Sequence, residues 1–207
     1  MNTPLGKDST PEGKDTVRAD LLARRRLMSE SFRADAAEAI AFHVLATPVV
    51  SRARRVACYL SMPSEPGTGP LITALVAHGV EVIVPVALPG GAVRERTLDW
   101  VALGEKADLF MTSGLGIREP AGPRLGATAL DRCDAIIVPA LAVDHAGHRL
   151  GRGAGYYDRA LAPVDGPARA PVCAVVFTHE LMAEVPHEPH DVPVQMAATP
   201  DGIFRVL

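Results

Sequence analysis

The sequence predicts an α/β fold: a single-domain, three-layer sandwich in which helices cover both faces of a mostly parallel central sheet. Four short apolar runs lack the alternation of a half-exposed strand, which is typical of strands buried in a parallel sheet. They are Arg55–Leu60, Glu81–Ala87, Ala135–Pro139 and Pro171–Phe177. Residues 61–80, between the first two runs, read as a loop, a helix and a capping glycine, and this order indicates a βαβ unit.

The N-terminal part predicts a tail followed by two helices. Residues 1–12 are polar and contain Pro and Gly, so we expect a disordered tail in front of one domain at 13–207. Over residues 14–45 the apolar side chains recur at helical spacing, and Ser29–Ser31 is expected to divide this stretch into two helices. Pro48 is expected to end the second of them.

Shorter elements complete the expected fold. Ligands of open α/β sheets bind beyond the carboxyl ends of the parallel strands, so the loop Ser61–Thr68 is expected at the functional edge of this Rossmann-like sheet. After the turn expected at Pro89–Gly91, the sequence predicts an edge strand or hairpin arm at Arg94–Trp100 and irregular chain at 103–130 with a sharp loop at Gly116–Pro120. Further on, we expect a short helix at Tyr156–Leu161, a loop at His187–Gln195 and a last edge strand at Ile203–Val206.

The bulk composition argues against several classes of function. With a net charge of −3 and 4% aromatic residues, the chain lacks the basic surface and stacking side chains of a nucleic-acid-binding protein. The run Arg24–Arg26 is expected on a solvated helix face. Cys58, Cys133 and Cys173 suit buried free thiols in a reducing compartment. There is neither a signal-peptide core nor an apolar run near the ~20 residues that span a membrane, so we expect a cytoplasmic protein.

One stretch, Arg149–Asp158, carries the strongest chemical signal. Three glycines at alternate positions let the backbone approach a ligand closely, and two arginines among them can fork onto phosphate oxygens. The stretch is neither a P-loop, which needs Gly-Lys-Ser/Thr, nor a dinucleotide-binding fingerprint, whose third glycine is here Tyr156. A flexible surface loop is the alternative, but a linker would prefer Ser and Gly to Arg and Tyr. We expect a site for ATP and Mg²⁺.

Several residue types that bind metals occur near this stretch. Asp158 and Asp191 carry hard carboxylate oxygens, which suit Mg²⁺ bridged by phosphate, although each could instead cap a helix or loop. His187–Asp191 also contains metal-ligand types, but Pro189 keeps them from sharing a helix face, and a solvated loop is the preferred interpretation. The same interpretation is preferred for His145 and His148, on either side of a glycine turn.

Five motifs in this order resemble the 5-formyltetrahydrofolate cyclo-ligase family, also called 5,10-methenyltetrahydrofolate synthetase. The resemblance covers nearly everything from Lys14 to about Thr199, and its most specific part is Arg149–Asp158. The other four motifs are Lys14 with Arg18, Tyr59–Glu65 with Thr68, Gly116–Pro120, and Asp191–Pro193. The family implies an ATP-dependent ring closure. ATP phosphorylates the formyl oxygen of 5-formyltetrahydrofolate, N10 attacks the activated carbon, and 5,10-methenyltetrahydrofolate, ADP and phosphate leave.

The resemblance also implies the site residues. Arg149 and Arg152 would be catalytic, Asp158 and Asp191 would bind Mg²⁺, and Glu65 would accept hydrogen bonds from the pterin. The implied ATP-binding residues are Lys14, Arg18, Arg149, Leu150, Gly151, Arg152, Gly153, Ala154, Gly155, Tyr156 and Tyr157. The implied folate-binding residues are Leu60, Glu65, Arg152, Gly153, Ala154, Gly155 and Tyr156. Trp100 is a weaker candidate for the folate wall, because a lone Trp is more often part of a core.

Two positions depart from the family, and two other functions remain open. Ala154 stands where the family often has Gly or Lys, and Gln195 where many members carry Asp. A non-catalytic binder on the same fold would have lost phosphate or metal ligands, yet they are present. A phosphosugar enzyme would leave Tyr59–Glu65 without a purpose. The expected partners are ATP and 5-formyltetrahydrofolate, with or without a polyglutamate tail, with no nucleic acid and no membrane, and the protein is expected to be a monomer.

Overall fold

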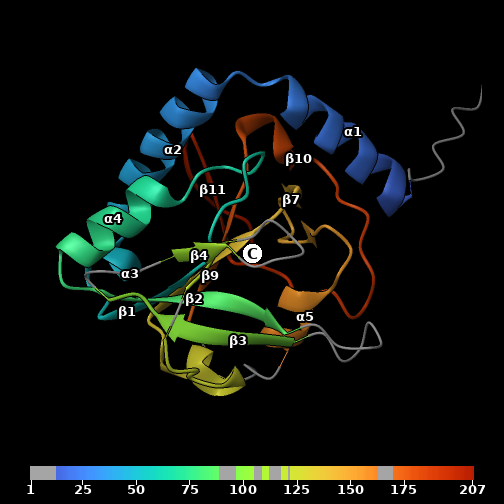
Figure 1. Ribbon diagram of the computed structural model, residues 1–207. Helices are drawn as coiled ribbons and strands as arrows, with labels where there is room; N and C mark the ends of the chain where they lie inside the picture. The colour runs from blue at the N-terminus through green and yellow to red at the C-terminus, as the bar shows by residue number, and fades with distance from the viewer. Residues whose placement is uncertain (1–12, 89–96, 105–108, 112–117, 121, 163–169) are drawn as a thin grey trace, which may run out of the picture.

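A seven-stranded sheet forms the centre of the computed structural model, which describes residues 13–88, 97–104, 109–111, 118–120, 122–162 and 170–207. Its five inner strands run parallel, and an antiparallel strand flanks them at each edge (Figure 1). In spatial order the strands are β12 (Gly202–Arg205), β11 (Met196–Thr199), β9 (Val172–Val175), β6 (Ala135–Pro139), β1 (Arg55–Cys58), β2 (Glu81–Leu88) and β3 (Thr97–Ala102).

Helices cover both faces of this sheet. On one face α2 (Glu30–Leu45) and α4 (Gly69–Ala77) pack through Ile40, Leu71 and neighbouring apolar residues against the inner strands. On the other face α5 (Tyr156–Leu161) and the 3₁₀ helix η2 (Ala127–Arg132) contribute Leu161 and Leu130. Such packing on both faces explains why the central strands are apolar throughout. The predicted three-layer α/β sandwich is therefore confirmed.

A second, smaller layer lies beyond the carboxyl ends of the parallel strands. It is a three-stranded sheet of β7 (Ala142–Asp144), β8 (Arg149–Leu150) and β10 (Leu181–Met182). The 3₁₀ helix η3 (Thr178–Glu180) lies directly before β10 in the chain. Helix α1 (Lys14–Leu27) packs on this layer and not on the large sheet (Figure 1). Val17 and Leu21 of α1 contact Leu141 and Leu150 there. The small layer therefore holds the N-terminal helix against the segment that carries Arg149.

Local signals account for most element boundaries. Met28 and Ser29 are extended and separate α1 from α2. Ser29 is the N-cap of α2, and its hydroxyl accepts a hydrogen bond from the Phe32 backbone N–H. Gly79, with φ of 75°, turns the chain from α4 into β2. The predicted runs correspond to β1, β2, β6 and β9, and the short helix is found at its predicted bounds. The last edge strand is present, one residue earlier than predicted.

Other predictions were incomplete or wrong. Pro48 does not simply end the second helix, because it occupies the first turn of a further short helix, α3 (Pro48–Ser51). Strand β11 was not predicted at all. Residues 103–130 are not wholly irregular, since they include η2 and the hairpin β4 (Leu109–Met111) with β5 (Arg118–Pro120). The predicted tail at 1–12, the turn at Pro89–Gly91 and the first two residues of Gly116–Pro120 lie outside the described residues.

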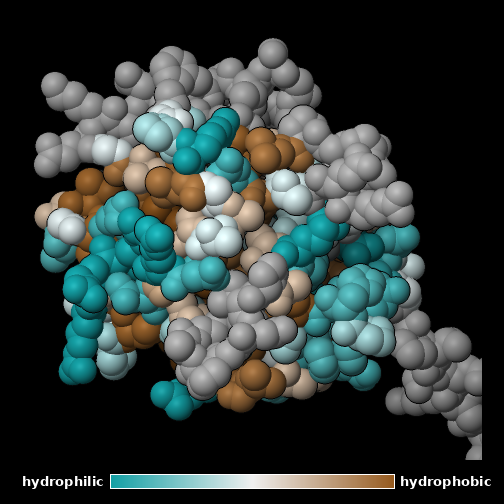
Figure 2. Space-filling view, turned by 90° about the horizontal axis from the view of Figure 1, so that it is seen from below, coloured by the Kyte–Doolittle hydropathy of each residue, from teal (hydrophilic) through white to brown (hydrophobic). Residues whose placement is uncertain are grey.

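One face of the molecule carries both hydrophilic and hydrophobic residues (Figure 2). On the face seen from below in Figure 2, hydrophilic residues cover much of the coloured surface, and hydrophobic residues interrupt them in separate patches. This mixture is typical of a surface in contact with water. In the part of the chain that the structure describes, no helix is both long and apolar enough to cross a bilayer.

Candidate active site

A cavity of about 380 Å³ opens at the carboxyl edge of the parallel sheet, between that edge and the small layer. It brings together five segments that are far apart in sequence: the start of α1, the loop after β1, the chain after β6, the stretch 149–158, and the loop at 188–191. All the predicted site residues line it: Lys14, Arg18, Leu60, Glu65, Arg149, Leu150, Gly151, Arg152, Gly153, Ala154, Gly155, Tyr156, Tyr157, Asp158 and Asp191. Their individual roles remain predictions.

Arg149 is a largely buried residue of the cavity lining. It lies in β8 with only 5% of its surface exposed, and its Nη2 donates to Asp158 Oδ1 over 2.5 Å. Its Nη1 lies 3.5 Å from the Pro139 carbonyl oxygen at the end of β6, while its Nε has no hydrogen-bond partner among the described residues. A buried guanidinium with a donor to spare is suited to an anion that enters the cavity.

The glycines of the stretch shape its backbone. Gly153 and Gly155 have φ of 94° and 67°, a region that other residues adopt only with strain. Gly155 is also the N-cap of α5, so this turn sets the direction in which Asp158 leaves the helix. Arg18 of α1 rests on the same backbone, because its Nε donates to the Gly151 carbonyl oxygen over 3.0 Å. The glycines therefore supply the positive φ angles of the turn, and the carbonyl of Gly151 joins it to α1.

Arg152 pairs with the residue predicted to recognise the pterin. Its Nε lies 3.2 Å from Glu65 Oε1, and its Nη2 donates to Ser64 Oγ at 3.2 Å. Glu65 is 6% exposed, and its second carboxylate oxygen accepts the Met62 backbone N–H at 2.9 Å. Burial raises the pKa of Glu65, although the Met62 amide and the Arg152 charge oppose that effect. The loop after β1 thus presents a carboxylate that has lost much of its hydration.

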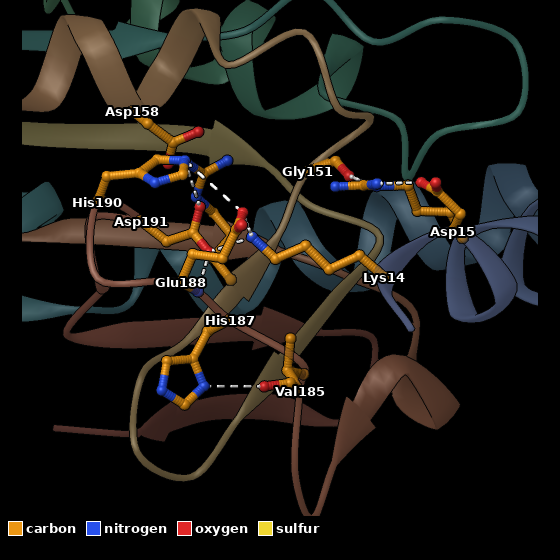
Figure 3. A network of polar contacts seen from close by, with 11 residues as sticks. Lys14, Asp15, Gly151, Asp158, Val185, His187, Glu188, His190 and Asp191 are labelled. Atoms are coloured by element: carbon orange, nitrogen blue, oxygen red, sulfur yellow. Dashed lines mark hydrogen bonds and ion pairs between the residues drawn. The ribbon is translucent and has the colours of Figure 1, made fainter. Parts of the chain in front are cut away.

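Lys14 binds two acids of the loop at 188–191. Its Nζ donates to Glu188 Oε2 and to Asp191 Oδ2, each over 2.6 Å (Figure 3). Burial opposes the ionisation of Asp191, but hydrogen bonds from Lys14 and from the Glu188 backbone N–H outweigh it and lower its pKa. Burial likewise opposes the charge of Lys14, and the two carboxylates overcome it and raise the Lys14 pKa.

The loop at 188–191 brings more ligand atoms together than the sequence indicated. One ligand atom each from Glu188, His190 and Asp191 lies within 4.8 Å of the other two. Pro189 prevents a helix, as expected, but the loop itself turns these side chains to one side (Figure 3). Glu188 and His190 line the cavity and were not among the predicted site residues. Their spacing around a proline gave no periodic signal that could have identified them.

The remaining candidates divide between the cavity and the core. Leu60, Leu150 and Tyr157 give the cavity apolar walls, and burial raises the pKa of Tyr157 well above its usual value, which keeps its hydroxyl protonated. Tyr156 also lines the cavity, under the Arg159 guanidinium, 5.7 Å from its ring centroid. Trp100 is 1% exposed in the core cluster, so it does not wall the cavity.

One expectation about the basic run in α1 is wrong. Arg24 is exposed as expected, but Arg25 is 1% exposed and forms an ion pair with Glu180, which is 0% exposed. The sequence places three arginines in a row, and nothing local distinguishes the one that points inward. Arg25 also borders the cavity.

Comparison with known proteins agrees with this geometry. A family model described as the 5-formyltetrahydrofolate cyclo-ligase family matches residues 10–200. A Mycolicibacterium smegmatis protein named 5-formyltetrahydrofolate cyclo-ligase is 39% identical over 191 residues, which cover 92% of this chain and 95% of that protein. An Escherichia coli protein of the same name is 30% identical over 182 residues, which cover 88% of this chain and 97% of that protein.

Solved structures show the same fold. The NMR structure of Aquifex aeolicus 5,10-methenyltetrahydrofolate synthetase matches with a TM-score of 0.76 and 27% identity, over 93% of this chain and 92% of that chain. A synthetase from Mycoplasma pneumoniae matches with a TM-score of 0.66 at 16% identity, which supports the fold alone.

Proposed function

The chain belongs to the 5-formyltetrahydrofolate cyclo-ligase family, and we propose that the cavity lined by Arg149–Asp158 is where it closes the ring of its folate substrate with ATP. The reaction converts 5-formyltetrahydrofolate and ATP to 5,10-methenyltetrahydrofolate, ADP and phosphate. One observation carries the proposal: the residues that four separate motifs implied for ATP, metal and folate line one continuous cavity.

The chemistry requires two ligands to meet at one point. The formyl oxygen attacks the γ-phosphorus of ATP, and the bond between that phosphorus and the ADP oxygen breaks. N10 then adds to the formyl carbon and loses its proton, while the carbon–oxygen bond breaks and releases phosphate. An amide-like oxygen is a poor leaving group, and phosphorylation makes it a good one. In such transfers a protein mainly positions the groups and stabilises charge.

Four cations around the stretch are proposed to hold the triphosphate. Lys14 and Arg18 approach from α1, and Arg149 and Arg152 from the stretch itself. The two α1 residues would bind nucleotide phosphates, and the two arginines of the stretch would hold the transferring group as it gains charge. The backbone amides of the glycines would contribute further donors.

Asp158 and Asp191 are the proposed ligands of Mg²⁺. Both line the cavity, both carry hard oxygen donors, and each is now held by a cation of the protein, Arg149 or Lys14. A site that already attracts positive charge to two carboxylates fits a divalent cation of this type. When bound with ATP, the ion would neutralise charge on the phosphate oxygens.

The apolar half of the cavity is proposed to take the folate. Leu60 and the neighbouring side chains would contact the pterin, and the carboxylate of Glu65 would accept hydrogen bonds from its N–H groups. Arg152 pairs with Glu65 while also reaching the phosphate side. Arg152 is therefore the residue at which the two ligands would meet.

The organisation of the chain supports three further proposals. Segments from both ends of residues 13–207 meet in the cavity, which is consistent with a single catalytic domain. One chain supplies the whole lining, which is consistent with a monomeric enzyme. Cys58, Cys133 and Cys173 are free and buried, which suits a reducing compartment such as the cytoplasm.

A direct assay tests the proposed function. Purified full-length protein is mixed with 5-formyltetrahydrofolate, ATP and Mg²⁺, and the near-ultraviolet absorbance of the methenyl product is followed. We expect the absorbance to rise only when all three are present, with one phosphate released for each product formed. A flat trace from folded protein would contradict the proposal and favour a non-catalytic binder.

A further inference from the structure

A buried ion pair lies at the wall of the cavity: Arg25 lines it, but neither Arg25 nor its partner Glu180 is among the residues proposed to bind ATP, metal or folate. Arg25 and Glu180 are 1% and 0% exposed. Arg25 Nε donates to Glu180 Oε1 over 2.6 Å, and its Nη2 donates to Glu180 Oε2 over 2.7 Å, so the guanidinium forks onto the carboxylate. This two-pronged contact fixes the orientation of both side chains.

The pair joins α1 to two central strands. Arg25 Nη2 also donates to the carbonyl oxygen of Ala140, which directly follows β6, over 2.6 Å. Glu180 Oε2 in turn accepts the backbone N–H of Phe177, just beyond β9, over 2.8 Å, and the Arg25 guanidinium lies 5.5 Å from the centre of the Phe177 ring. The Arg25–Glu180 pair is therefore at the carboxyl edge of the sheet, where the cavity opens.

The same face of α1 carries the cations proposed for ATP. Lys14, Arg18 and Arg25 are separated by four and seven residues, so at about 100° per residue they lie along one side of the helix. Among the residues of α1, only Val17, Leu21 and Arg25 are buried. Val17 and Leu21 make apolar contacts without direction, whereas the forked ion pair of Arg25 has a fixed direction. Arg25 therefore adds a directional contact of α1 beyond those that Lys14 and Arg18 make themselves.

Stability alone does not explain this pair. Removing two charges from water is costly, and apolar groups of similar volume often stabilise a core as well or better. What an apolar pair does not supply is the directional contact to Glu180 and Ala140. We propose that Arg25 and Glu180 are positioning residues, which hold α1 so that Lys14 and Arg18 meet the phosphates of ATP. This inference rests on the proposed function.

Substituting both residues of the pair distinguishes an effect on the placement of α1 from an effect on the stability of the fold. Arg25→Met alone leaves Glu180 charged and buried, and Glu180→Gln alone does the same to Arg25, so both single variants should melt well below the wild type. The double variant carries no buried charge, keeps the side-chain volumes, and leaves an amide oxygen for the Phe177 N–H. We expect it to regain most of the melting temperature, yet to show a KM for ATP raised about tenfold, with the KM for folate and kcat little changed.

A double-mutant cycle tests whether the pair acts through the α1 cations. The reference for this test is the variant that carries Lys14→Met and Arg18→Met. Adding Arg25→Met and Glu180→Gln to that reference should raise its KM for ATP by less than about twofold. Binding of ADP, measured by calorimetry, should follow the same pattern. The matched control is Arg24→Met on the same helix: Arg24 pairs over 2.9 Å with Asp20, both are exposed, and its loss should leave both KM values unchanged.

Arg25→Lys gives an independent measurement if the neutral variant does not fold. Lysine keeps the positive charge opposite Glu180 but lacks the two parallel donors of a guanidinium. We therefore expect a folded protein whose KM for ATP lies between those of the wild type and the double variant. A wild-type KM for ATP in either folded variant would overturn the proposal. So would an effect in the Lys14→Met, Arg18→Met background as large as in the wild type. Turnover by the wild-type enzyme tests the proposed function separately.

Discussion

Lys14 Nζ lies 2.6 Å from Asp191 Oδ2, although 177 positions separate the two residues in the chain. A cation proposed for ATP therefore rests on a carboxylate proposed for Mg²⁺. Arg149 and Asp158 repeat the arrangement at 2.5 Å, and Arg152 and Glu65 repeat it at 3.2 Å on the folate side. When ATP, Mg²⁺ or folate binds, the ion pair of the protein at its proposed site must therefore open, and the ligand takes the place of one partner.

Lys14→Met should weaken ATP binding and strengthen metal binding. Without the ammonium group, Asp191 and Glu188 lose the cation that contacts both of them, so a divalent cation no longer has to displace it. We expect Mn²⁺ to bind more tightly in the absence of nucleotide, measured by electron paramagnetic resonance, while the KM for ATP rises by roughly tenfold. Lys14→Arg, which keeps the charge, is the control and should bind Mn²⁺ like the wild type. Weaker Mn²⁺ binding in Lys14→Met would contradict the exchange.

Arg149→Met should reduce kcat by more than about tenfold without unfolding the protein, because a charge that stabilises the transferring phosphoryl group is lost while most of the buried volume is kept. Circular dichroism would establish that the fold is intact. Arg205→Met, which replaces an exposed arginine on β12, is the matched control and should turn over at the wild-type rate. Normal turnover in Arg149→Met would remove Arg149 from the catalytic residues.

Glu65→Gln should raise the melting temperature of the protein at pH 7 and also raise its KM for folate. Burial raises the pKa of Glu65 above 4.5, so the contribution of Glu65 to stability is fully present only below pH 4.5 and is lost as the pH rises through the folded-state pKa. At pH 7 the variant should therefore melt at a higher temperature than the wild type, and below pH 4.5 the difference should shrink. Its KM for folate should rise, since an amide supplies one acceptor fewer. A lower melting temperature at pH 7 would show that Glu65 stabilises the fold.

Asp144→Asn should destabilise the small layer. The Asp144 carboxylate is 2% exposed and accepts hydrogen bonds from the backbone N–H groups of Ala146, His148 and Val185 and from His148 Nδ1. Burial opposes its ionisation, but these hydrogen bonds prevail and lower the Asp144 pKa below 3.8. We expect a loss of about 1–3 kcal/mol of unfolding free energy at pH 7.

The pH dependence of that loss has a definite sign. A lowered folded-state pKa stabilises the protein above pH 3.8, and this contribution disappears as the pH falls through the folded-state value. The gap between wild type and Asp144→Asn in urea unfolding should therefore close in acid. Asp201→Asn, at an exposed position, is the control and should show no gap. A gap that persists well below pH 3.8 would mean that the carboxylate charge is not what stabilises this turn.

The parts of the fold with a local cause could be predicted from the sequence. Buried strands are apolar whatever their partners, so the runs at β1, β2, β6 and β9 were found. Strand β11 carries Ala197 and Ala198 in a run of four residues, and it becomes a strand because β9 and β12 pair with it on both sides. That cause is not local. The same holds for Arg25, whose inward direction depends on a partner 155 positions away.

The candidate site shows the same division. Arg149–Asp158 was visible because its glycines and arginines are adjacent in the chain, and the rest of the predicted set came from motifs that resemble a family. Glu188 and His190 belong to no such motif. Glu188 joins the cavity with Lys14, which donates to it, and His190 lies 3.8 Å from Glu188 and 3.7 Å from Asp191 in the same loop. Contacts between distant segments were thus the part that sequence patterns did not predict.

The partners of α1 have a consequence for the synthesis of the chain. Val17 and Leu21 can meet Leu141 and Leu150 once the middle of the chain has left the ribosome, but Arg25 must wait for Glu180, and Lys14 for Glu188 and Asp191. Helix α1 is therefore made early but completes its polar contacts only after residues 180–191 have been synthesised. A nascent chain that stops before these acids leaves α1 held by apolar contacts alone, and its Lys14 and Arg25 are open to the polyanions around the ribosome.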